Sequence, residues 1–145
     1  MRSLIILSIL LPTLCSAQAL RQIDYYDVWP YQYGKYGITP IFGPVSISGL
    51  QTLTLILKRH SRHGVLDSMT LHYLNSRGDL HLSVPLSYQC LANKNRCFLE
   101  FAIEPHYQNN IEIEALYQTP TNPQRLIEYR IKEIGVMGSL LQKKR

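Results

Sequence analysis

The sequence predicts an all-β fold: an antiparallel meander that forms a small β-sandwich or a partly open barrel, preceded by a cleaved signal peptide. Three observations predict it. Apolar and polar residues alternate with a period of two over several short runs, which are rich in β-branched and aromatic residues. Clusters of Gly, Pro, Asn and Ser separate the runs. The first nineteen residues have the composition of an export signal.

The signal peptide is predicted at residues 1–19. Arg2 supplies the basic start, a short apolar run follows, and small residues lead to cleavage after Ala17 or Ala19. The apolar run is shorter than the about 20 residues that a membrane-spanning helix needs, so we expect no transmembrane span. We therefore expect an exported protein, either periplasmic or secreted.

Export also determines how the cysteines are interpreted. Cleavage removes Cys15 and leaves Cys90 and Cys97. An even number of cysteines in an oxidising compartment indicates a disulfide bond, and we expect one between these two residues. A metal site would need more closely spaced or more numerous ligands.

The mature chain of about 126 residues has the length of one domain. We divide it into an N-terminal arm at residues 20–44, rich in aromatic residues, Pro and Gly, a β-sandwich domain at 45–135, and a short basic tail at 136–145. The formal net charge of +5 is scattered, without the broad basic face that nucleic acids need, so we expect no nucleic-acid partner. The basic run at residues 58–63 is expected to be a solvated loop.

Seven strands are expected in the sandwich domain. They cover residues 45–48, 51–58, 69–74, 79–88, 97–104, 111–117 and 126–134. Pro85 points outward in the fourth of these strands. It indicates an edge strand or a bulge, because proline cannot donate a hydrogen bond to a neighbouring strand.

The first two expected hairpins share the strand at 79–88. In the first, the turn that precedes this strand places His72 opposite His81. In the second, Cys90 lies opposite Cys97, and the pairing continues along both strands with apolar residues facing apolar residues.

The last expected hairpin places Ile113 opposite Ile131, which aligns apolar residues on one face. Opposite charges then meet on the other face, where each cross-strand pair contributes a few tenths of a kcal/mol and helps to fix the register. These outer pairs are Glu114 with Arg130 and Glu112 with Lys132.

Six aromatic residues stand within twelve positions of the arm. They are Tyr25, Tyr26, Trp29, Tyr31, Tyr33 and Tyr36. Tyr and Trp combine a large contact area with a hydrogen-bonding tip, which is typical of interfaces and sugar-binding surfaces. We consider three interpretations: the arm binds a protein partner, it folds back over the sandwich and closes the core, or Trp29 and nearby tyrosines bind a glycan.

Other side chains offer weaker signals. His72 and His81 are weak candidate metal ligands that lack an obvious third ligand. Four glutamates that could serve as paired carboxylates for glycoside hydrolysis are expected on one outer face: Glu100, Glu104, Glu112 and Glu114. The sequence contains no nucleophile elbow, phosphate-binding Gly loop or zinc-protease motif, so we expect neither catalysis nor a cofactor.

These observations lead to the hypothesis of an exported, non-enzymatic binding or assembly protein. It would be an accessory component of a cell-envelope or surface machine, and its arm would contact a protein partner in the envelope or the extracellular space. One alternative is a secreted carbohydrate-binding protein that uses Trp29 and nearby tyrosines. Another is a structural subunit that polymerises by strand exchange, as fimbrial subunits do.

Overall fold

The computed structural model of the chain describes residues 22–104 and 110–134. Strands make up 64% of these residues and helices 7%, which confirms the all-β prediction. The expected signal peptide, Cys15 and the basic tail lie outside the described residues.

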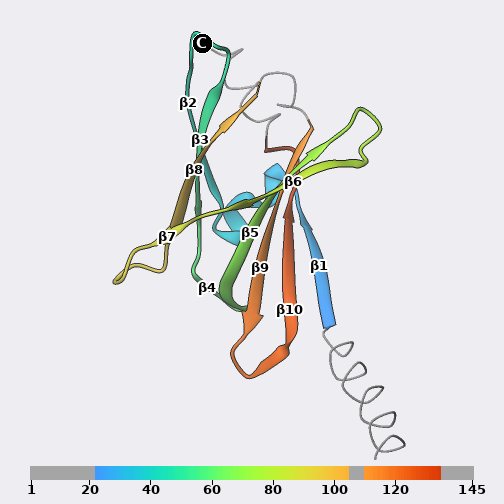
Figure 1. Ribbon diagram of the computed structural model, residues 1–145. Helices are drawn as coiled ribbons and strands as arrows, with labels where there is room; N and C mark the ends of the chain where they lie inside the picture. The colour runs from blue at the N-terminus through green and yellow to red at the C-terminus, as the bar shows by residue number, and fades with distance from the viewer. Residues whose placement is uncertain (1–21, 105–109, 135–145) are drawn as a thin grey trace, which may run out of the picture.

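The described strands form two sheets (Figure 1). Sheet A has the order β1-β10-β9-β5-β4, with β6 also paired to β5, and sheet B has the order β2-β3-β8-β7. The strands of sheet A are β1 (Gln22–Val28), β4 (His60–Ser61), β5 (Gly64–Leu74), β6 (Leu80–Leu86), β9 (Ile111–Thr119) and β10 (Asn122–Ile131). Those of sheet B are β2 (Thr39–Val45), β3 (Gln51–Leu57), β7 (Gln89–Cys90) and β8 (Cys97–Ile103). Two short helical segments, η1 (Pro30–Gln32) and α2 (Tyr33–Tyr36), connect β1 to β2.

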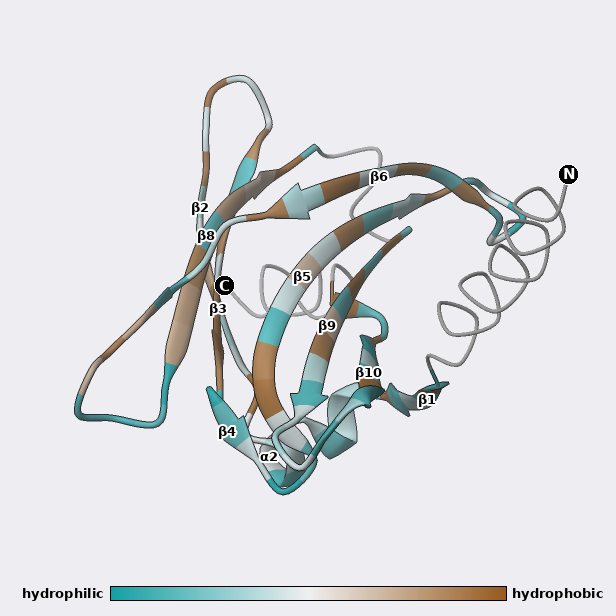
Figure 2. Ribbon diagram, turned by 60° about the horizontal axis from the view of Figure 1, so that its bottom comes forward, coloured by the Kyte–Doolittle hydropathy of each residue, from teal (hydrophilic) through white to brown (hydrophobic). Residues whose placement is uncertain are grey.

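Sheet A curls into a half-barrel, and Figure 2 shows its strands following one another around a curved surface. Among the described strand pairs, only β1 and β10 are parallel. The prediction of antiparallel sheets is therefore confirmed, and the half-barrel agrees with the expected partly open barrel.

One hydrophobic core joins the two sheets. It is built from the alternating apolar residues of the strands, so that Leu53 and Leu55 of β3 and Ile113 of β9 are fully buried. Burial of each such side chain stabilises the fold by about 1.5–3 kcal/mol. The intervening residues Glu112 and Glu114 lie on the opposite face of sheet A, which we call the outer face.

The arm contains strands, although all seven strands expected from the sequence lie outside it. Its described part forms β1, η1, α2 and β2, so both ends of the arm are strands. The prolines of β2, Pro40 and Pro44, are tolerated because this strand lies at the edge of sheet B. The strand expected at 45–48 is accordingly wrong: β2 ends at Val45, and Ser46 accepts a hydrogen bond from Gly49 in a turn.

The strand expected at 79–88 is confirmed for residues 80–86, which form β6, but its continuation toward the cysteines is wrong, because the chain changes sheets after Leu86. β6 pairs with β5 in sheet A, whereas β7 pairs with β8 in sheet B. The hydroxyl of Tyr88, at the crossing, donates to the carbonyls of Leu66 and Asp67 at 3.1 and 3.0 Å. The second expected hairpin is thus confirmed only beside the cysteines, and β3 is the main partner of β8.

The first hairpin has a different register from the expected one. His72 lies opposite Ser83 rather than His81. The side chain of Asn75 accepts hydrogen bonds from the backbone amides of Arg77 and Asp79, and the ladder carries an irregularity directly before this turn. The two-residue shift preserves the apolar alternation, which is why the alternation alone could not detect it.

The last hairpin has the expected register. Ile113 lies opposite Ile131 and Glu114 opposite Arg130, and Lys132 is 3.0 Å from Glu112. The expectation for Pro85 is also confirmed, because β6 is bonded only to β5 among the described strands.

Candidate functional site

The six aromatic residues of the arm divide into an anchored half and an exposed half. Tyr33 is buried, and its hydroxyl donates to the carbonyl of Lys132. Tyr26 and Tyr36 pack against the core, where both rings make edge contacts with Tyr129. These three residues fix the arm to sheet A, so the core-closing interpretation accounts for half of the cluster.

The other three residues remain accessible. Tyr25 is 54% exposed, Trp29 37% and Tyr31 85%. We call them the exposed aromatic group. They lie within seven positions, on β1 and the turn that follows it, at the edge of sheet A (Figure 1).

The local sequence dictates this division. The alternation of β1 directs Asp24, Tyr26 and Val28 toward one face and Ile23 and Tyr25 toward the other. Pro30 then begins η1, since its missing N–H group is not needed at a helix start. The segment ends at Gly37, whose positive φ of 69° favours glycine.

A chain of hydrogen-bonded polar groups crosses the outer face of sheet A. The hydroxyl of Ser83 is 2.8 Å from Nδ1 of His72, and Nε2 of the same ring is 2.7 Å from the carboxylate of Glu114. Glu114 shares a hydrogen bond with Glu128, which also accepts one from Arg130 at 2.6 Å. The chain therefore links β6, β5, β9 and β10, and Arg130 in turn lies 4.0 Å above the Tyr25 ring.

The two carboxyl groups of this chain differ in acidity. Burial, together with the hydrogen bond to Glu114, raises the pKa of Glu128 to about 7. Burial also acts to raise the pKa of Glu114, but hydrogen bonds to Glu128 and His72 outweigh it and lower that pKa. The pair can therefore hold one proton near neutral pH.

The order of groups in this chain is that of an activated serine, a hydroxyl followed by an imidazole and a carboxylate. Such activation also requires donors directed at the developing oxyanion. Here the carboxylate of Glu114 also shares a hydrogen bond with a second carboxyl group, Glu128, so the chain connects four neighbouring strands of sheet A. These hydrogen bonds contribute to the pairing of the strands.

The expected set of four glutamates is not on one face. Glu100 and Glu104 belong to the β8 region of sheet B, whereas Glu112 and Glu114 lie on β9 of sheet A. The residue that sequence reasoning missed is Glu128, although its alternation with Arg130 places it on the outer face. Its hydrogen bond to Glu114 brings the carboxyls closer than the about 5–10 Å used in glycoside hydrolysis.

The expected histidine pair is separated by the register of the first hairpin, since His72 faces Ser83. Within residues 22–104 and 110–134, no three His, Cys, Asp or Glu side chains are grouped closely enough to hold a metal ion.

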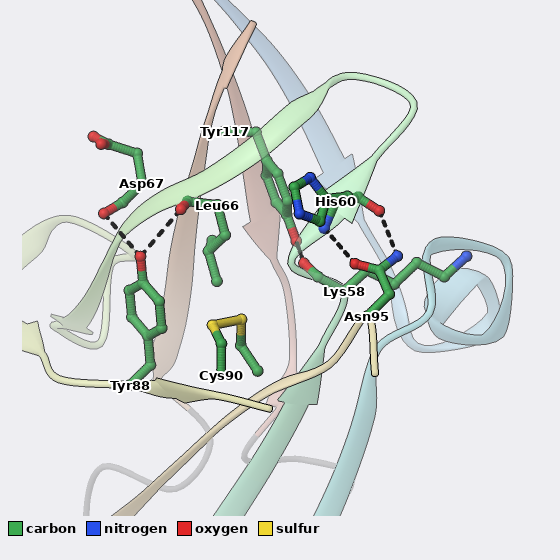
Figure 3. The surroundings of a disulfide bond; sticks show 9 residues. Lys58, His60, Leu66, Asp67, Tyr88, Cys90, Asn95 and Tyr117 are labelled. Carbon is green, nitrogen blue, oxygen red and sulfur yellow. Dashed lines mark hydrogen bonds between the residues drawn. A yellow bond between two sulfur atoms is a disulfide. The ribbon is translucent and has the colours of Figure 1, made fainter. Parts of the chain in front are cut away.

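The predicted Cys90–Cys97 pair is confirmed at disulfide distance, and it closes the loop between β7 and β8 (Figure 3). The side chain of Asn95, in this loop, binds the backbone of His60 twice: it accepts from the N–H at 2.6 Å and donates to the carbonyl at 2.7 Å. The disulfide loop of sheet B is thereby attached to β4 of sheet A.

Comparison with protein-family models, curated proteins and solved structures gave no significant match. No helix in the described ranges has the length and apolar character needed to cross a membrane.

Proposed function

We propose that this chain is an exported, non-enzymatic binding or assembly protein that attaches to a protein partner through its exposed aromatic group. The observation that carries the proposal is the division of the arm into residues that anchor it and residues that stay accessible. A segment fixed in one conformation loses little conformational freedom when it binds, and exposed Tyr and Trp side chains supply most of the energy at many interfaces.

The position of the group at a sheet edge supports the same function. Among the described strands, β1 pairs with β10 alone, so its other edge has backbone groups that a partner strand could bond. Ile23 and Tyr25 project from one face of this edge and could contact side chains of the added strand.

The test is affinity capture from the native host with the triple variant Tyr25→Ser, Trp29→Ser and Tyr31→Ser. The substitutions leave the anchoring residue Tyr33 intact, whereas deletion of the arm would remove β1. We expect the triple variant to keep the thermal unfolding midpoint within a few degrees and to lose the partner captured by the wild type by about tenfold or more.

The matched control is Ile47→Ser, which removes a fully exposed apolar side chain from the turn between β2 and β3. It should capture the partner as the wild type does. Equal capture by the wild type and the triple variant would contradict the proposal.

Titration of Trp29 fluorescence with a panel of neutral sugars distinguishes the carbohydrate-binding alternative. Under our proposal the emission is unchanged across the panel. A saturable change that is weakened in the double variant Tyr25→Ser/Tyr31→Ser, which keeps Trp29 as the only tryptophan, would favour a glycan ligand.

A further inference from the structure

A cationic pocket is lined by residues of α2, β4 and β10 and of the segments beside β4. Figure 2 shows α2 and β4 close together at one end of the molecule. The volume of the pocket is about 220 Å³. The lining combines basic side chains with two tyrosines and a serine: Lys35, Tyr36, Lys58, His60, Arg62, Tyr129 and Ser61. The sequence suggested only a solvated basic run at residues 58–63, because Lys35 and Tyr129 reach the same place from distant segments.

The positive charge of this pocket is not neutralised within the described part of the chain. Lys35, Lys58 and Arg62 form no ion pair with a described carboxylate, whereas Arg125, Arg130 and Lys132 each do. The guanidinium of Arg62 instead donates to the ring of His63 at 3.2 Å. Three permanent cations thus border a small cavity that no carboxylate lines.

Several contacts hold the walls of the pocket in place. The hydroxyl of Tyr117 donates to the carbonyl of Lys58 at 2.6 Å. The side chain of Lys58 occupies the space beside Gly37, where a Cβ atom would lie 2.5 Å from Cε of the lysine. Asn95 holds both backbone polar groups of His60, as Figure 3 shows. The backbone under the basic side chains is therefore fixed before any ligand binds.

Two tyrosine rings and a serine hydroxyl complete the lining of the pocket. The rings of Tyr36 and Tyr129 meet edge to face, with centroids 5.2 Å apart. Ser61 forms a side-chain hydrogen bond with Tyr129. Rings beside cations are suited to a ligand that carries a compact anion on a small ring or chain.

We propose that this pocket binds the phosphate group of a phosphomonoester. A phosphomonoester carries a charge of about −1.5 to −2 at neutral pH and three acceptor oxygens, which matches a pocket lined by three cations better than a carboxylate does. The volume of about 220 Å³ admits the phosphate and part of the group attached to it.

The test is an NMR titration of the oxidised protein with glucose 6-phosphate, with glucose and glucuronate as the neutral and monocarboxylate counterparts. We expect saturable shifts of the Lys35, Tyr36 and Ser61 amides with glucose 6-phosphate. Glucose should leave them unchanged, and glucuronate should bind at least about tenfold more weakly. Glucuronate binding as tightly as the phosphate ester would overturn the assignment.

Variants then locate the site. Arg62→Gln removes one cation, and Lys58→Met removes another while keeping the aliphatic stem beside Gly37. Each variant should bind glucose 6-phosphate about tenfold more weakly, which is the effect of losing one charge-assisted hydrogen bond. Arg77→Gln makes the same charge change in the exposed turn before β6 and should not alter the affinity. Equal weakening by Arg77→Gln and Arg62→Gln would show a non-specific charge effect and reject the pocket.

The phosphate group could belong to a soluble metabolite or to a lipid headgroup. Vesicles of phosphatidylcholine containing phosphatidic acid, which ends in a phosphomonoester, separate these sources. Binding of the vesicles that Arg62→Gln weakens, without binding of glucose 6-phosphate, would assign a lipid source. Binding of the sugar phosphate alone would assign a soluble one. Binding of neither would overturn the proposal.

Discussion

Glu128 is a residue whose burial and hydrogen bonding the sequence does not predict. Alternation along the strand places it on the outer face with Arg130, and a solvated carboxylate would be the ordinary expectation. The residue is instead only 6% exposed and shares a hydrogen bond with Glu114. This environment depends on the pairing of β10 with β9, which brings Glu128 next to Glu114, and a pattern along one strand does not contain that pairing.

The raised pKa of Glu128 predicts how stability depends on pH. Between its ordinary value of 4.5 and about 7, the folded protein retains a proton that the unfolded chain releases. The free energy of unfolding should therefore be greatest, as far as this group is concerned, below pH 4.5. It should fall by about 2–3 kcal/mol as the pH rises to 7, and then level off.

Glu128→Gln should remove this decrease, because the amide cannot ionise. Urea unfolding at several pH values between 4.5 and 7.5 measures the decrease in the free energy of unfolding for the wild type and for the variant. Glu100→Gln, on sheet B, is the control and should leave the slope unchanged. A wild-type profile parallel to that of Glu128→Gln would contradict the assignment.

At the scale of elements, the hairpins differ in how well the sequence predicts them. The last hairpin carries opposite charges on one face and apolar pairs on the other, so a single register satisfies both. The side chains of the strand expected at 79–88 are compatible with pairing to the strand before it and to the strand after it. They do not indicate that the chain changes from sheet A to sheet B between β6 and β7. The apolar alternation of this segment is equally compatible with pairing in either sheet.

The contribution of the disulfide loop to the stability of the fold can be measured. Closure of so short a loop by Cys90 and Cys97 should stabilise the fold by about 2–3 kcal/mol on the loop-entropy model. The variant Cys90→Ala/Cys97→Ala should lose this amount in urea unfolding under oxidising conditions. Reductant should destabilise the wild type by a similar amount and leave the variant unaffected. A response of the variant to reductant would contradict this explanation.

At the scale of the whole molecule, the sequence predicted the class of fold but not its connectivity. Period-two alternation reports which residues are buried, and this was sufficient for an all-β, two-layer protein. The alternation within one strand does not identify its partner when that partner is distant in the sequence. The arm illustrates the difference: β1 bonds to β10, and Gln22 lies beside Arg125, a residue 103 positions away.

Removal of β1 tests whether the arm is part of the domain. Val28 is fully buried and lies opposite Ile131. Deletion of residues 22–28 should therefore abolish cooperative unfolding in urea or shift its midpoint strongly downward. Tyr25→Ser, on the same strand, removes an exposed ring and its contact with Arg130, and it should lower the free energy of unfolding by no more than about 1 kcal/mol. A deletion that unfolds like the full chain would show that the arm is dispensable to the domain.

The parallel pairing of β1 with β10 also constrains the order of assembly. The segment that carries the exposed aromatic group is synthesised about 100 residues before its only described strand neighbour, since Gln22 pairs with Arg125. Long-range closure of this kind slows folding and leaves an unpaired strand exposed in the interim. During synthesis the aromatic segment is therefore without its neighbour until β10 has emerged, and in this interval its apolar side chains are open to misassociation.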